Sequence, residues 1–120
     1  MGARTVGIHP LTVAAVSQAA TVYSSAVKTN RSTGEVALLV TITGTTGITI
    51  TQQCSLDGIT FYDAVDASNN AVGAVVSAAA AGTRYVVYSP ALANYMRFKV
   101  VENNTGPATV TLSLMMQEEV

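Results

Sequence analysis

Short runs in which apolar and polar residues alternate make up most of the sequence. The clearest run spans residues 35–43, where every second position holds a branched apolar residue. Alternation with a period of two places these residues on one face of a β-strand. The opposite face carries Ala37 and Leu39 beside two threonines. We therefore expect a central strand that a second sheet covers on one side and a neighbour or arm covers on the other.

A hairpin is predicted around Asp57–Gly58. This dipeptide supplies the positive φ angles of a two-residue type I′ turn, and apolar residues flank it on both sides. If Leu56 faces Ile59 across the turn, then Cys54 faces Phe61. The buried face of the hairpin would then hold Ile48, Ile50, Cys54, Leu56, Ile59 and Phe61, with Gln53, Ser55, Thr60 and Tyr62 on the other face.

Further strand patterns follow the same rule, and turn residues separate them. They span residues 21–27, 71–77, 83–88, 95–102 and 108–117. The alanine-rich segment 78–82 fits either a loop or a short helical turn. With about seven or eight short strands, the sequence predicts an all-β fold, an antiparallel β-sandwich or jelly roll. We assign residues 1–20 to an N-terminal arm and residues 21–120 to the sandwich domain.

The strand faces also predict a core. Its expected members are Val36, Leu38, Val40, Ile42, Ile50, Leu56, Phe61, Phe98, Val100, Val110, Leu112 and Leu114.

The chain is poor in charge. Only 11% of its 120 residues are charged, 49% are hydrophobic, and the formal net charge is -1, whereas soluble domains average about 25% charged residues. Such a surface lacks the self-repulsion that keeps small domains apart, so we expect it to contact other proteins. The scattered basic residues argue against nucleic acid as a partner. No run approaches the roughly 20 apolar residues of a membrane span, so we expect no membrane partner either.

Candidate chemistry is sparse. His9 is the single histidine and lies in the expected arm, where a catalytic triad would lack fixed positions. Cys54 is the single cysteine, and its place in the alternation favours a small buried hydrophobe over a reactive thiol. One histidine and one cysteine cannot complete a zinc site. We therefore expect no enzymatic activity, no metal and no cofactor.

Residues 63–70 contain the densest group of oxygen ligands, which are Asp63, Asp66, Asn69 and Asn70. Calcium prefers such ligands, but their spacing matches no EF-hand loop and no terminal glutamate follows. A solvated turn is the expectation, with calcium as the alternative.

The order of these signals resembles small bacteriophage capsid decoration, or cement, proteins. The resemblance covers approximately residues 20 to 116, and its motifs describe hairpins rather than chemistry. The residues that carry it are Gln53-Cys54-Ser55-Leu56-Asp57-Gly58, Phe61, Arg97-Phe98-Lys99-Val100 and 109–114. The resemblance implies a homotrimeric β-sandwich on the outer capsid surface of a virion, bound to the major capsid protein and stabilising the shell.

The resemblance also implies that the N-terminal arm reaches across shell subunits. The expected contact residues are Thr5, Val6, Ile8, His9, Pro10, Leu11 and Val13, while Asp57 and Gly58 are expected to be structural. Deleting the first sixteen residues should then leave the domain folded but release it from the capsid.

Two alternatives remain open. The first is a receptor- or glycan-binding module of a phage tail or fibre, which would use the 63–70 loop and exposed tyrosines. The second is a secreted or surface adhesion domain of a bacterium, which would require cleavage of the N-terminal segment.

Overall fold

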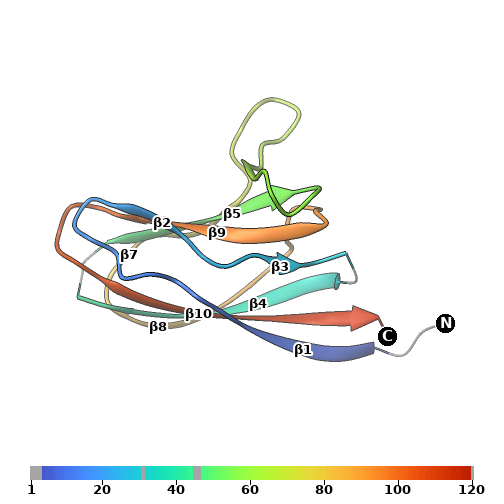
Figure 1. The fold of residues 1–120 in the computed structure, drawn as a ribbon, viewed down its shortest axis with the longest axis horizontal. Coiled ribbons are helices and arrows are strands. Elements are labelled where there is room, and N and C mark those ends of the chain that lie inside the picture. The colour runs from blue at the N-terminus through green and yellow to red at the C-terminus, as the bar shows by residue number, and fades with distance from the viewer. Residues whose placement is uncertain (1–3, 31, 45–46, 120) are drawn as a thin grey trace.

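Ten antiparallel strands form two facing sheets in a computed structural model, which describes residues 4–30, 32–44 and 47–119 (Figure 1). In chain order the strands are β1 (Arg4–Leu11), β2 (Thr21–Tyr23), β3 (Val27–Lys28), β4 (Ser32–Thr43), β5 (Ile48–Ser55), β6 (Tyr62–Asp63), β7 (Ala74–Ala79), β8 (Gly82–Tyr88), β9 (Tyr95–Glu102) and β10 (Thr109–Glu119). The predicted all-β sandwich is confirmed. The described residues form no helix, and hence none that is long and apolar enough to cross a membrane.

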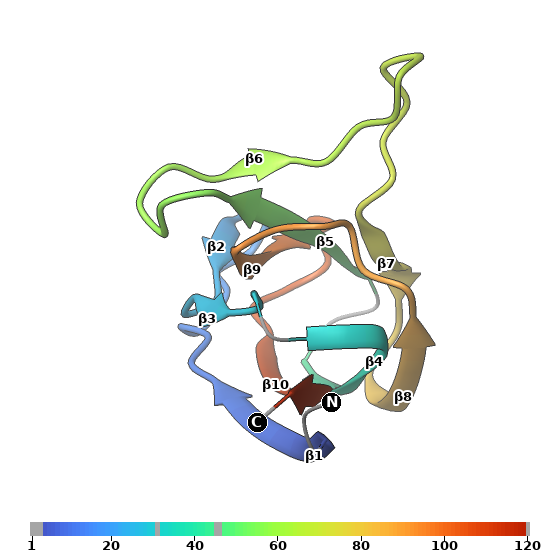
Figure 2. The same cartoon turned by 90° about the vertical axis from the view of Figure 1, so that its right-hand side faces the viewer.

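The chain passes repeatedly between the two sheets. One sheet has the strand order β1-β10-β4-β8, and the other has the order β2-β9-β5-β6, with β3 beside β9 and β7 beside β5. The strand expected at 21–27 is split into β2 and β3. The alanine-rich segment is the end of β7 and a short loop that leads to β8, rather than a helical turn. Figure 2 shows the connection from β6 to β7 standing away from both sheets.

The core lies between the sheets and follows the predicted alternation. Over residues 36–42 of β4, 96–102 of β9 and 110–116 of β10, every second side chain points inward and is buried. Ten of the twelve residues predicted for the core are buried there, the exceptions being Leu56 and Phe61. Each large apolar side chain that is fully buried contributes about 1.5–3 kcal/mol relative to exposure. This burial accounts for the pairing of two otherwise independent sheets.

The N-terminal segment is an edge strand of the sandwich and not a separate arm. β1 pairs with β10 along its whole length, from Arg4 opposite Glu119 to Leu11 opposite Leu112. Both Leu11 and Val16 are buried in the core. The expectation of an arm over residues 1–20 is therefore wrong for the described part of it. Without β1 the edge of β10 would lose its backbone partners, so deleting sixteen residues would damage the fold itself.

The Asp57–Gly58 hairpin has a wider turn than predicted. Cys54 pairs with Tyr62 and not with Phe61, a shift of one residue in register. A type I′ turn needs positive φ at both central residues, but of the pair only Gly58 has one, at 78°. The Asp57 carboxylate instead accepts the amides of Ile59 and Thr60 at 2.8 and 3.0 Å. These bonds lower the pKa of the Asp57 carboxyl and stabilise the wider loop.

The changed register turns three residues of the predicted buried hairpin face outward. Leu56 and Ile59 lie in the loop and are each 83% exposed. Phe61 lies on the outer face of the six-stranded sheet, where its ring stacks on the guanidinium of Arg97. The expectation that these residues share a buried face with Ile50 is therefore wrong.

Glu102 ties together the loops at one end of the sandwich. Its side chain is 2% exposed, and Oε1 accepts the amides of Ala19 and Asn104 at 2.9 and 2.8 Å. Oε2 accepts both the amide and the hydroxyl of Thr105, each at 3.1 Å. The β1–β2 and β9–β10 connections thus share one buried carboxylate.

Replacing Glu102 with alanine should lower the free energy of unfolding by about 1–3 kcal/mol, because the amides of Ala19, Asn104 and Thr105 lose a shared charged acceptor at once. Urea unfolding followed by circular dichroism measures this. Glu35→Ala is the matched control, since Glu35 is exposed at the start of the predicted central strand and its loss should change stability by less than about 0.5 kcal/mol. Equal stability of the two variants would contradict the role of Glu102.

Candidate protein-binding surfaces

The outer side of the four-stranded sheet carries a continuous apolar row. Ile8 lies opposite Met115, Met115 opposite Ala37, and Ala37 opposite Val87. One row of apolar side chains therefore crosses all four strands. We call this row and its neighbours the apolar face, which comprises Val6, Ile8, Ala37, Leu39, Tyr85, Val87 and Met115.

Several members of the apolar face are strongly exposed. Val6 and Ile8 are each 64% exposed, Tyr85 is 60% and Val87 is 53%. Between them lies a shallow depression of about 230 Å³, lined by Val6, Tyr85, Val87 and Met115 among others. Contiguous exposed apolar surface of this kind marks contact sites, whereas singly scattered apolar residues do not. The second cover expected over the central strand is not part of the described chain, so this side of β4 is open.

The edges of the same sheet are protected against pairing. In β1, Pro10 lacks a backbone N–H, which confines it to an edge position. In β8, Arg84 lies opposite Val40 on the inward side, and its Nη1 donates to the carbonyl of Ala80 at 2.8 Å. Inward-pointing charges and prolines are devices that block edge-to-edge association. The face, rather than either edge, is therefore the surface that can accept a protein.

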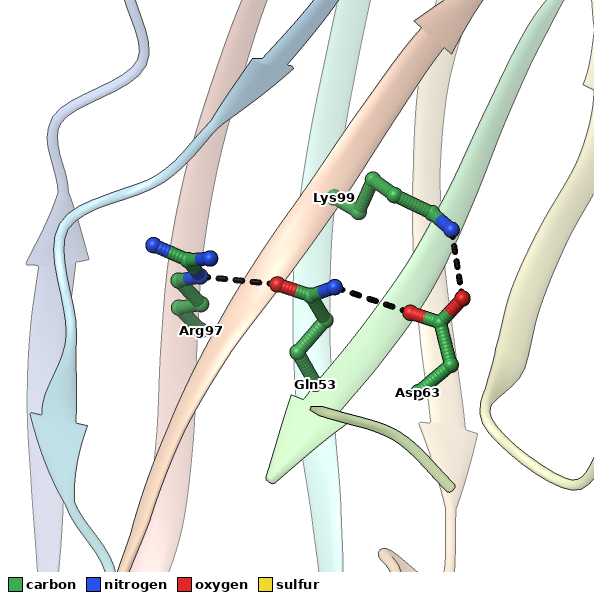
Figure 3. Close-up of polar contacts among 4 residues, drawn as sticks. All are labelled: Gln53, Asp63, Arg97 and Lys99. Atoms are coloured by element: carbon green, nitrogen blue, oxygen red, sulfur yellow. Dashed lines mark hydrogen bonds and ion pairs between the residues drawn. The ribbon is translucent and has the colours of Figure 1, made fainter. Parts of the chain in front are cut away.

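A polar network covers the outer side of the other sheet (Figure 3). Arg97 Nε donates to Gln53 Oε1 at 2.8 Å, and Gln53 Nε2 donates to Asp63 Oδ1 at 2.8 Å. Lys99 Nζ then donates to Asp63 Oδ2 at 2.6 Å. The chain of contacts crosses β9, β5 and β6. It anchors β6, which has only two residues of its own, to the centre of the sheet.

Two aromatic rings hold the guanidinium of Arg97. Its central carbon lies 4.2 Å from the ring centroid of Tyr23 and 4.4 Å from that of Phe61. Cation–π contacts of this kind are worth about 0.5–2 kcal/mol, depending on desolvation. Phe61 therefore packs on Arg97 at the outer surface. The alternation of apolar residues in the sequence did not predict this position.

The 63–70 loop is organised by its own hydrogen bonds. Asp66 Oδ1 accepts the amides of Ser68 and Asn70, both at 2.9 Å. The amide of Asn70 is the main cause that lowers the pKa of Asp66. Asp63 lies in the polar network and binds Lys99. Within the described ranges, no three His, Cys, Asp or Glu side chains gather into a metal-binding group. The geometry fits the expected turn.

The residues expected to contact a capsid are divided between surface and core. Thr5, Val6, Ile8 and Pro10 are exposed, Leu11 is buried, and Val13 packs against the core. The half-buried His9 is hydrogen-bonded through Nε2 to the carboxylate of Glu118 of β10. Only the outward-facing members can belong to a contact surface.

Cys54 lies in the other sheet and is half-buried, and burial raises the pKa of its thiol. Gln52, which is fully buried, donates from Nε2 to Cys54 Sγ at 3.5 Å and accepts from the Tyr88 hydroxyl at 3.0 Å. Burial also raises the pKa of Tyr88 well above its ordinary value. His9 and Cys54 belong to different sheets and form no catalytic pair.

No protein-family model matches the chain, and comparison with curated proteins gives no match.

The pKa of Asp63 lies below its ordinary value of 3.8, mainly because Lys99 donates to the carboxylate. Replacing Lys99 with glutamine should raise that pKa, as followed by the ¹³C shift of the carboxyl during an acid titration. Because the folded-state pKa is the lower one, the stability that Asp63 contributes is present at neutral pH and is lost as the pH falls through that value. Lys28→Gln, on β3, should leave the titration of Asp63 unchanged. A titration that is insensitive to Lys99→Gln would contradict the ion pair.

Proposed function

We propose that this chain is a structural, protein-binding subunit that docks on a neighbouring protein through its apolar face. The observation that carries the proposal is the row from Ile8 through Met115 and Ala37 to Val87, which crosses an open sheet face. Burying such a row against a partner removes apolar surface from water, and this makes the bound state more stable than the free subunit. The protected edges support docking by the face.

We further propose that the neighbour is a bacteriophage major capsid protein. In this proposal the chain is a decoration protein that sits as a homotrimer on the outer capsid surface and stabilises the shell. The support is the resemblance of the hairpin motifs and the low charge of the chain. A subunit that binds the assembled shell and not its dissociated parts stabilises the shell by mass action. No catalytic step is part of this role.

A second candidate is the receptor- or glycan-binding module of a phage tail or fibre. The observation that favours it is an apolar pocket of about 190 Å³, lined by Leu56, Tyr62, Asp63 and Leu92 among others. Tyr62 is 67% exposed and Leu92 is 100% exposed. A tyrosine ring beside exposed apolar side chains is a surface on which a sugar can stack. This pocket lies on the six-stranded sheet, away from the apolar face.

A matched pair of valines tests the apolar face. Val87 on that face is 53% exposed, and Val65 on the projecting loop is 51% exposed. Val87→Asp should weaken co-sedimentation with capsids more than roughly tenfold, because docking would bury an unpaired charge. Val65→Asp should bind as the unchanged chain does.

Thermal unfolding of both variants checks that each is folded. Equal binding by the two variants would overturn docking through the apolar face. Failure of the unchanged chain to bind any capsid, together with binding on a glycan array that Tyr62→Ala abolishes, would favour the tail module instead.

A further inference from the structure

We propose that Arg97 forms a carboxylate-binding site for an acidic side chain of a partner protein, on the sheet opposite the apolar face. The inference does not depend on the proposed function, because it concerns a different surface. It starts from the way the guanidinium is held. The rings of Tyr23 and Phe61 both lie within stacking distance of it, and Gln53 accepts from its Nε.

The acceptor that orients the guanidinium is itself fixed. Gln53 is 7% exposed, and its amide nitrogen is bound to Asp63, which is bound in turn to Lys99 (Figure 3). Three contacts of the guanidinium, with Tyr23, Phe61 and Gln53, thus determine where its plane lies. A group positioned in this way loses little conformational entropy when a ligand binds.

Hydrogen-bonding capacity remains on the guanidinium. Among the described residues, the only hydrogen bond of the Arg97 side chain is that of Nε, so both terminal nitrogens keep their N–H groups for another partner. The residue is half-buried and lies on the outward-facing side of β9. Two parallel N–H groups in one plane match the two oxygens of a carboxylate. The two aromatic rings beside the guanidinium lower the local polarity and so strengthen the pairing.

The number of free positive charges at this site favours a protein carboxylate as the ligand over a nucleic acid or polyphosphate. The network contains Arg97, Lys99 and Asp63, and Lys99 is already paired with Asp63, so a single positive charge remains. Nucleic acids and polyphosphates are recognised by several clustered cations, and this chain has a formal net charge of -1. One planar cation between two rings fits one aspartate or glutamate with apolar neighbours.

Two capped tripeptides test the site, acetyl-Gly-Glu-Gly-amide and acetyl-Gly-Gln-Gly-amide, added at constant ionic strength. The readout is the ¹H–¹⁵N signal of the guanidinium of Arg97, with that of Arg84 as the internal control. The glutamate peptide should shift the Arg97 signal saturably, with a dissociation constant in roughly the millimolar range, as expected of one exposed charged contact. The glutamine peptide should not. Equal shifts with both peptides, or at both arginines, would overturn the proposal.

Two variants distinguish recognition by the oriented N–H groups of Arg97 from attraction to its positive charge alone. Arg97→Lys keeps the charge but loses the planar pair of donors, and it should weaken binding roughly tenfold as seen in the remaining backbone signals of β9. Phe61→Leu keeps every charge and an apolar side chain but removes one ring, and it should weaken binding several-fold. Circular dichroism confirms that each variant is folded.

Unchanged affinity in both variants would show simple charge attraction and overturn the site. Val87→Asp should bind the glutamate peptide as the unchanged chain does, so failure of this site and failure of the apolar face are distinguishable.

Discussion

The sandwich depends on closing the end at which the chain passes from one sheet to the other. The connections there carry amide groups that no strand pairing satisfies, and a backbone donor without a partner costs about as much as a lost hydrogen bond where water cannot reach it. Glu102 meets this constraint from the last position of β9, where one carboxylate accepts from two separate connections. The amide of Asn103 adds a bond of 3.0 Å to the carbonyl of Gly47 in the β4–β5 turn. The connections on either side of β9 and the residue before β5 are thus joined at this point.

Once the core is closed and the edges are protected, the two sheet faces are what the molecule offers to others. They differ in chemistry. The four-stranded sheet presents apolar side chains that water solvates poorly, and the six-stranded sheet presents a fixed cation between two aromatic rings. A partner that covers the first face gains mainly from burial, which is not directional, whereas a partner at Arg97 must bring a charge in one orientation. The two surfaces suit different partners or different parts of one partner.

The sequence predicted the strands whose alternation coincides with burial. β4, β9 and β10 were found in this way, since their inward residues are apolar and most of their outward residues are polar. β1 was missed for the opposite reason. Val6 and Ile8 point outward and His9 points inward, so the pattern carries no signal that distinguishes an edge strand from an arm.

The candidate surfaces could be predicted only in part. The open face of β4 was visible as Ala37 and Leu39, but its continuation into β8 and β1 requires the strand order, which periodicity does not contain. The Arg97 site could not be predicted from the sequence, because it forms only when the strands of the Asp57–Gly58 hairpin are shifted by one residue from the expected pairing. Capture of backbone amides by Asp57 widens that turn and carries Phe61 to the outer face, an effect that turn propensity alone does not include.

The pairing of β1 with β10 has a further consequence for how the protein can be handled. Arg4 lies opposite Glu119, so both ends of the described chain meet at one corner of the four-stranded sheet (Figure 1). A short linker across that corner would close the backbone into a ring, and the projecting β6–β7 connection offers a place to open it again. Such a circular permutant would move any fused label from the rim of the apolar sheet to the far side of the molecule.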